Sequence, residues 1–129
     1  MGLDMYAYAV AKGADLENKS VDVSLEGLDD SLERIAYWRK FNHLHGWMNE
    51  LYHAKGGKSP DFNLDTVEIT ENDLNDLEKA LEDGLPHTPG FFFGGDEVYP
   101  EDIEETKAFI ETARECLQSG QRVFYYAWW

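Results

Sequence analysis

A stripe of polar and aromatic side chains is the part of this sequence best suited to chemistry. Its members recur at helical spacing and are Trp38, Asn42, His45, Asn49 and Tyr52. An imidazole titrates near neutral pH, so His45 is the candidate acid–base group if the stripe lines a pocket. The neighbouring Arg39 would then hold an anionic group of the ligand.

A helix must position these side chains, and the spacing predicts one over residues 30–55. A second stripe beside the first is apolar, as on the core-facing side of a helix, and consists of Tyr37, Phe41, Leu44, Met48 and Leu51. The polar stripe lies about 100° further round the helix, which places it at the margin of the core. Side chains there can satisfy nearby loops, line a pocket or receive a partner, and the pattern leaves all three interpretations open.

A glycine-bracketed loop at residues 90–95 supplies the other wall of the hypothetical pocket. It contains three consecutive phenylalanines and lacks the lysine and hydroxyl of a phosphate-binding loop. The candidate residues for a pocket or partner surface are therefore Trp38, Arg39, Asn42, His45, Asn49, Tyr52 and Phe92.

The sequence gives little support for a metal site or for a catalytic nucleophile. His43, Glu50 and His53 lie near one face of the predicted helix, and Glu50-x-x-His53 matches one element of a di-iron bundle. The second such element is missing, so we expect no metal and no cofactor; a mononuclear site completed by a distant acid is the alternative. Cys116 falls beside an apolar helical line, as a structural thiol does. We predict no catalytic residues and favour a non-enzymatic protein.

Charge is the strongest compositional signal. The chain holds 11 basic and 26 acidic residues, a net charge of −15. Residues 1–60 contain 7 basic and 9 acidic side chains, and residues 61–129 contain 4 and 17. Direct binding to nucleic acid is not expected, because no basic patch can replace phosphate counterions. An acidic surface favours basic partners, divalent cations or simply solubility.

The remaining patterns predict one α+β domain over residues 1–129: a small, mostly antiparallel sheet with about three helices on one face. Besides the long helix, we expect strands at residues 2–12, 21–25 and 122–129, a short extended piece at 67–69, and helices between Thr70 and Gly84 and between Pro100 and Gly120. The closing strand ends in two tryptophans, whose rings we expect to be docked.

The chain has no apolar run of membrane-span length, and an acid stands near its start where a signal peptide carries lysines. We therefore expect a cytoplasmic protein that does not contact a membrane. Its single cysteine excludes an internal disulfide.

Four motifs, in order along nearly the whole chain, resemble an uncharacterised family of small bacterial and bacteriophage proteins. They are MGLDMY at residues 1–6, AYWRKxNxxHxW at 36–47, LPxTxGFFFG at 85–94 and FYYxxW at 124–129. Some members carry the label phosphoglycerate kinase, which does not suit a chain this short without a nucleotide-binding signature. The sequence departs from the family after residue 94, where a tyrosine-rich acidic stretch is expected. The resemblance implies a phage or prophage setting and carries over no catalytic residue.

The leading functional hypothesis is an acidic phage or prophage-type accessory protein that binds a protein partner with a basic surface, one version being nucleic-acid mimicry. The competing hypothesis is a small-molecule-binding protein or enzyme, with its pocket between the polar stripe and the loop at residues 91–93. A homodimer joined through exposed aromatic side chains is the third.

Overall fold

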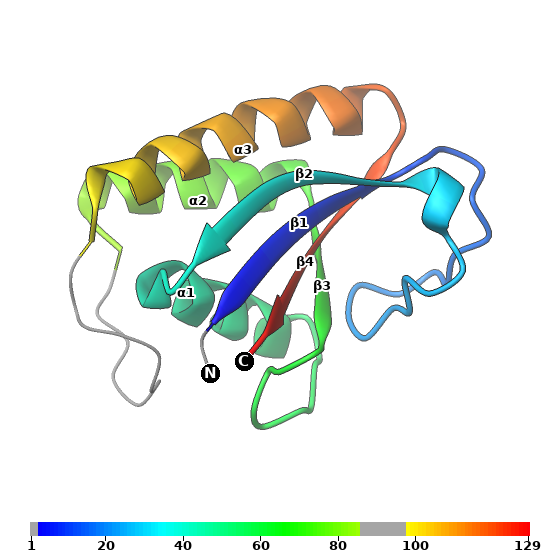
Figure 1. The fold of residues 1–129 in the computed structure, drawn as a ribbon, viewed down its shortest axis with the longest axis horizontal. Coiled ribbons are helices and arrows are strands. Elements are labelled where there is room, and N and C mark those ends of the chain that lie inside the picture. The colour runs from blue at the N-terminus through cyan, green and yellow to red at the C-terminus, as the bar shows by residue number, and fades with distance from the viewer. Residues whose placement is uncertain (1–2, 86–97) are drawn as a thin grey trace.

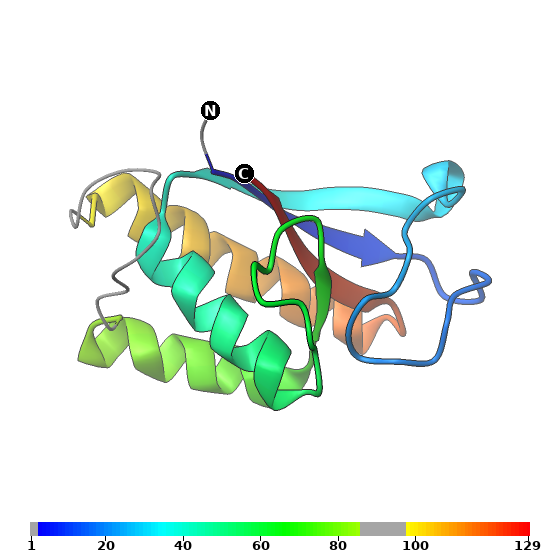
Figure 2. The same cartoon turned by 90° about the horizontal axis from the view of Figure 1, so that it is seen from below.

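The computed structural model describes residues 3–85 and 98–129, and within them one antiparallel sheet is covered by helices on one face (Figures 1 and 2). The elements in chain order are β1 (Asp4–Val10), the short 3-10 helix η1 (Asp29–Ser31), β2 (Leu32–Arg39), α1 (Asn42–Ala54), β3 (Thr66–Ile69), α2 (Glu71–Asp83), α3 (Pro100–Gln118) and β4 (Arg122–Trp128). The strand order is β2-β1-β4-β3, and each neighbouring pair is antiparallel. This architecture confirms the predicted α+β class.

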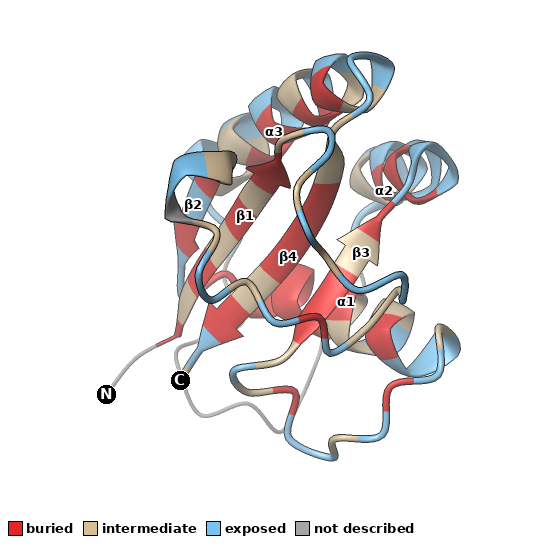
Figure 3. Ribbon diagram, turned by 90° about the vertical axis from the view of Figure 1, so that its right-hand side faces the viewer, coloured by how far each residue is buried: buried red, intermediate tan, exposed pale blue. Residues whose placement is uncertain are grey.

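The first strand has two different faces, as a period-two pattern requires. Met5, Ala7 and Ala9 are buried against the helices, while Tyr6 and Tyr8 are half-buried on the opposite side. The alternation is visible as red and tan bands along β1 in Figure 3. One face of the sheet therefore belongs to the main core, and the other carries tyrosines.

The closing strand lies in the same sheet as the first strand, as the sequence predicts, and it also pairs with the third. β4 pairs with β1 on one side and with β3 on the other. Trp129 is anchored by Asn63: the Trp129 backbone N–H donates to the Asn63 side-chain oxygen at 2.9 Å, and the Asn63 amide donates to the Trp129 carbonyl at 2.9 Å. Trp128 is 57% exposed, so the expectation that both terminal rings are docked is wrong for the first of them.

Residues 30–55 do not form the single helix that the spacing predicts. Asp30, expected near its start, lies in η1, and β2 follows, paired with β1 along its whole length. Ala36 and Trp38 are buried while the residues between and after them are exposed, which is strand alternation. Lys40 then adopts a left-handed conformation (φ +58°) that separates β2 from α1. No side chain caps α1 at its start, so the sequence lacked a signal for the true boundary.

The predicted strand at residues 21–25 is also wrong. Only Val21 bridges to a strand residue, Val67, and the following Asp22 turns away with a φ of +56°. The segment still buries apolar surface, because Val23 packs with Phe124 on the sheet face opposite the helices. This loop therefore covers part of that face and leaves the rest open.

The second helix begins directly after Thr70, as the sequence predicts, and Thr70 caps it. Thr70 accepts a hydrogen bond from the Asp73 backbone, and the Asp73 carboxylate accepts from the Thr70 backbone at 2.8 Å, forming a capping box. Lys55, at the end of α1, forms an ion pair with the same carboxylate. Within the described ranges, no helix combines the length and apolar character needed to cross a bilayer.

Candidate functional site

The polar stripe predicted to lie at the margin of the core lies mostly inside it. Trp38, Asn42, His45 and Tyr52 are buried, and Asn49 is half-buried. The premise of a marginal stripe on one long helix is therefore wrong, since Trp38 belongs to β2 and the others to α1.

Two aromatic members of the stripe connect separate elements of the fold. The Trp38 indole N–H donates to the Thr106 hydroxyl at 2.9 Å, which ties β2 to α3. The Tyr52 hydroxyl donates to an Asp22 carboxylate oxygen at 2.8 Å, which ties α1 to the long loop. These contacts favour the interpretation in which the stripe satisfies the surrounding structure.

His45 is enclosed by aromatic side chains. Its Nδ1 forms a 2.7 Å hydrogen bond with the Tyr125 hydroxyl, and its ring centroid lies 5.1 Å from that of Phe62. Burial lowers the pKa of His45 to about 3. A histidine with this pKa stays neutral at physiological pH and is poorly suited to acid–base work there.

The structure does not bring Arg39 to His45. Arg39 lies at the end of β2 with its guanidinium mostly exposed, 3.9 Å from the Asp4 carboxylate on the open face of the sheet. Phe92 and the rest of the loop at residues 90–95 lie outside the described residues.

The histidines considered as metal ligands are not gathered into one group. His43 is buried, whereas His53 is exposed and its two ring nitrogens hydrogen-bond with the backbone oxygens of Asn49 and Ser59. Among the described residues, no three His, Cys, Asp or Glu side chains lie close enough to hold a metal ion.

A groove between α2 and α3 is the first candidate interaction site. It has a volume of about 350 Å³ and is lined by Glu78, Leu81, Glu82, Ile103, Lys107, Ile110 and Glu111. The three aliphatic side chains form its apolar part and belong to, or pack against, the main core. The glutamates make its polar part strongly acidic, and Lys107 is the single basic residue among the described residues of its lining.

Arg114 holds the two helices that form this groove together. Its guanidinium donates to both carboxylate oxygens of Glu78, at 3.1 and 3.2 Å, and to the Asn75 amide oxygen at 2.8 Å. Hydrogen bonding to Arg114 lowers the pKa of Glu78. Because these bonds cross from α3 to α2, they fix the spacing of the helices without neutralising Glu82 or Glu111.

The charge of the chain is concentrated on these two helices. Residues 71–83 carry six acidic and one basic side chains, and residues 100–118 carry six and two, so together they supply −9 of the net −15. The groove therefore lies on the most acidic layer of the molecule.

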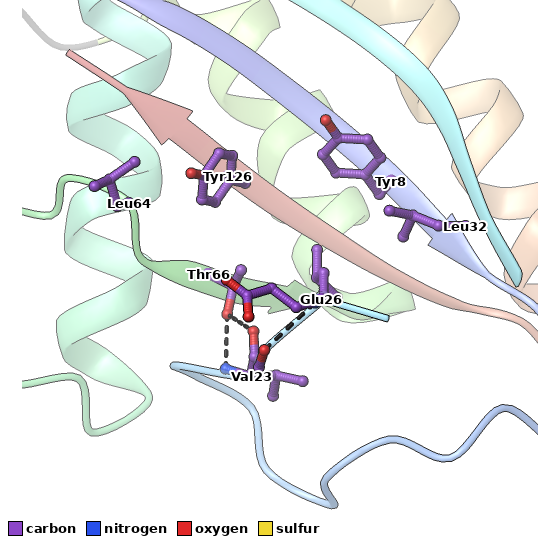
Figure 4. A pocket seen from close by; sticks show the side chains of 9 residues that line it. Tyr8, Val23, Glu26, Leu32, Leu64, Thr66 and Tyr126 are labelled. Carbon is purple, nitrogen blue, oxygen red and sulfur yellow. Dashed lines mark hydrogen bonds between the residues drawn. The ribbon is translucent and has the colours of Figure 1, made fainter. Parts of the chain in front are cut away.

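A hollow on the open face of the sheet is the second candidate (Figure 4). It measures about 410 Å³ and is lined by Tyr8, Val23, Ser24, Leu25, Glu26, Leu32, Leu64, Thr66 and Tyr126. Burial is the main cause that raises the pKa of Tyr126, and the neighbouring tyrosines, Asp65 and Glu26 raise it further. Burial also raises the pKa of Tyr8. Both tyrosines of the hollow are therefore neutral at physiological pH, and their rings and hydroxyls are available to a ligand.

Sequence reasoning missed this tyrosine face, although a signal was present. Tyr6 and Tyr8 occupy alternate positions of β1, opposite in parity to the small and apolar residues of that strand. Tyr126 faces Tyr6 in the register of β4. The face of an antiparallel sheet opposite the core normally carries polar side chains. Large aromatic residues there indicate an apolar patch, which can mark a binding site.

The molecule thus offers two surfaces of different chemistry, an acidic helical groove and a tyrosine-lined hollow. Both follow from the geometry and charge of the described residues. Comparison of the chain with family models, with curated proteins and with solved structures found no match.

Proposed function

We propose that this protein is a non-enzymatic binding protein whose acidic helical layer docks on a basic segment of a partner protein. The observation that carries the proposal is the groove between α2 and α3, in which aliphatic side chains are bordered by glutamates. The resemblance of the sequence to small bacterial and bacteriophage proteins supports an accessory role in a phage or prophage setting.

The groove suits an amphipathic segment that carries lysine or arginine beside its apolar residues. One or two aliphatic side chains would contact Leu81 and Ile103, while the basic groups would reach Glu82 and Glu111. The surrounding negative field accelerates encounter with a basic partner and makes association sensitive to salt.

Nucleic-acid mimicry is one version of this function. Carboxylates spread along two helices can occupy a basic site that otherwise binds phosphates. In that version, DNA and this protein compete for the partner, and competition in a binding assay with the isolated partner distinguishes it from simple docking.

A model peptide tests the groove directly. The probe is a synthetic amphipathic helix of leucine and lysine, compared by isothermal titration calorimetry with the same sequence carrying glutamate in place of lysine. We expect the lysine peptide alone to bind, with affinity falling as salt increases. The double variant Glu82→Lys/Glu111→Lys should weaken binding by about tenfold or more, as expected for the loss and reversal of two partly screened charge pairs.

The matched control is Asp15→Lys/Glu33→Lys, which changes net charge equally at exposed positions outside the groove. Equal weakening by both double variants would show that net charge, not the groove, attracts the peptide. The wild type and the two double variants, used as baits in a bacterial lysate, should retain a basic partner only when the groove is intact. Recovery of no salt-sensitive basic protein by the wild type counts against the proposal.

A further inference from the structure

The hollow on the open face of the sheet is a preformed pocket. Its volume of about 410 Å³ falls within the range of small-molecule sites, about 300–1,000 Å³. One wall comes from β1, β4 and β3, and the other from the loop at residues 23–26 (Figure 4). Among the described residues, none lines both this pocket and the groove between α2 and α3.

The tyrosine wall is held in place by its neighbours in the sheet. The Tyr6 ring neighbours both tyrosines of the pocket, with its centroid 6.0 Å from that of Tyr8 and 6.3 Å from that of Tyr126. Tyr6 also contacts the Tyr37 ring of β2 at 5.3 Å. Packed rings on paired strands lose little conformational freedom when a ligand binds.

The loop wall is fixed to the sheet through Thr66. The Val23 backbone N–H donates to the Thr66 hydroxyl oxygen at 2.8 Å, and this hydroxyl donates to the Val23 carbonyl at 2.9 Å. Just before this segment of the chain, the carbonyls of Glu17 and Lys19 accept hydrogen bonds from the Arg122 guanidinium at 2.8 and 2.9 Å. The pocket is therefore held from both sides before any ligand enters.

The charged side chain in the lining of the pocket is acidic. Glu26 is the single Asp, Glu, Lys, Arg or His among the described residues that line it. Within the described chain, no ion pair engages Glu26, whereas Arg122, a basic residue of the same face, is already paired with Glu68 at 2.9 Å. Arg34 pairs with Tyr8 in the register of β1 and β2, and its guanidinium carbon lies 5.6 Å from the Tyr37 ring centroid.

We propose that this pocket binds a small organic ammonium ion. The ammonium group lies near Glu26, and its alkyl substituents contact the faces of Tyr8 and Tyr126. Aromatic faces attract such cations through the negative potential of their π systems. A single carboxylate opposes anionic ligands but supplies too few oxygen ligands to select an inorganic divalent cation.

Choline and its uncharged isostere 3,3-dimethylbutan-1-ol separate this proposal from simple apolar binding. We expect choline to shift the amide NMR signals of the loop at residues 23–26 and of β4 in a saturable manner, and the neutral isostere to bind at least about fivefold more weakly. Equal affinity for the two probes, or the absence of a saturable shift with choline, overturns the proposal.

Variants locate the interaction. Glu26→Gln should weaken choline binding by about threefold to fivefold and leave the isostere unaffected, while Tyr126→Leu should weaken both probes. Glu82→Gln, in the other groove, is the matched control and should change neither. Glu26 is exposed, so its amide variant should fold normally, which circular dichroism checks. Unchanged choline affinity in folded Glu26→Gln contradicts the assignment and leaves the groove proposal untouched.

Discussion

At the residue scale, identity alone did not reveal the role of the polar side chains in the first half of the chain. His45 has the spacing of a pocket residue, yet its imidazole is enclosed by Tyr125 and Phe62. A buried polar group needs partners, and an aromatic hydroxyl supplies one here. The same chemistry that makes histidine attractive for catalysis makes it useful as a connector between α1 and β4.

Protonation of His45 should destabilise the fold. Its folded-state pKa of about 3 lies below the ordinary value of 6.5, so between these values the unfolded chain binds more protons. The stability that neutral His45 contributes is fully present above pH 6.5 and is lost as the pH falls toward 3. Between pH 6.5 and 5 we expect the free energy of unfolding to fall by about 1.5 kcal/mol from this group.

Urea titrations at several pH values check this expectation. His45→Gln retains a polar partner for Tyr125 but cannot take up the proton, so its stability should fall less over this interval than that of the wild type. His53→Gln, at an exposed position, should follow the wild type. An imidazole of His45 that titrates near pH 6 by NMR contradicts the assignment.

At the element scale, one carboxylate joins three pieces of structure. Asp73 completes the capping box of α2 with Thr70 and also receives the Lys55 ammonium from the end of α1. Lys55 donates a further hydrogen bond to the carbonyl of Glu68 in β3. The start of α2 is therefore set by local chemistry, while its position against α1 and β3 depends on a long-range ion pair.

Replacing this carboxylate should cost more than replacing an exposed one on the same helix. Asp73→Asn weakens the cap and leaves the mostly buried Lys55 ammonium without its countercharge, so we expect a loss of about 1–3 kcal/mol in the free energy of unfolding. Asp76→Asn, at an exposed position of α2, should change it by less than about 0.5 kcal/mol. Equal losses in urea denaturation would show that the ion pair and the cap add nothing measurable.

At the scale of the whole molecule, the sheet separates two chemically different sides. The helical side carries most of the negative charge, whereas the open side carries tyrosines and a hollow. β4 lies between β1 and β3 and completes the sheet that holds both sides. Its last residues are therefore structural, although they end the described chain.

Removal of residues 125–129 should prevent cooperative folding. The truncation deletes the buried Tyr125 and Ala127, the hydrogen bond to His45 and the docked Trp129. We expect the loss of a single thermal transition and of the near-ultraviolet circular dichroism signal. Trp128→Ala, which removes a ring that is 57% exposed, should retain both. A truncated chain with unaltered thermal stability would refute the central role of β4.

The sequence was sufficient where local chemistry decides structure. The alternation in β1, the Thr70 cap, the proline at the start of α3 and the apolar closing strand each predict their element, and together they predict the α+β class. The concentration of negative charge in residues 61–129 was likewise visible without coordinates.

Only the tertiary structure determined the secondary structure of residues 30–55. Trp38 and His45 fit one helical stripe, but pairing with β1 turned the first into a strand residue and left the second in a helix. A strand that runs directly into a helix can place side chains at the same three- and four-residue spacing as one continuous helix. No side-chain cap marks the boundary between β2 and α1, so the spacing could not separate the two cases. The two candidate binding surfaces have the same origin, since each is assembled from segments whose proximity depends on the packing of the complete sheet and its helices.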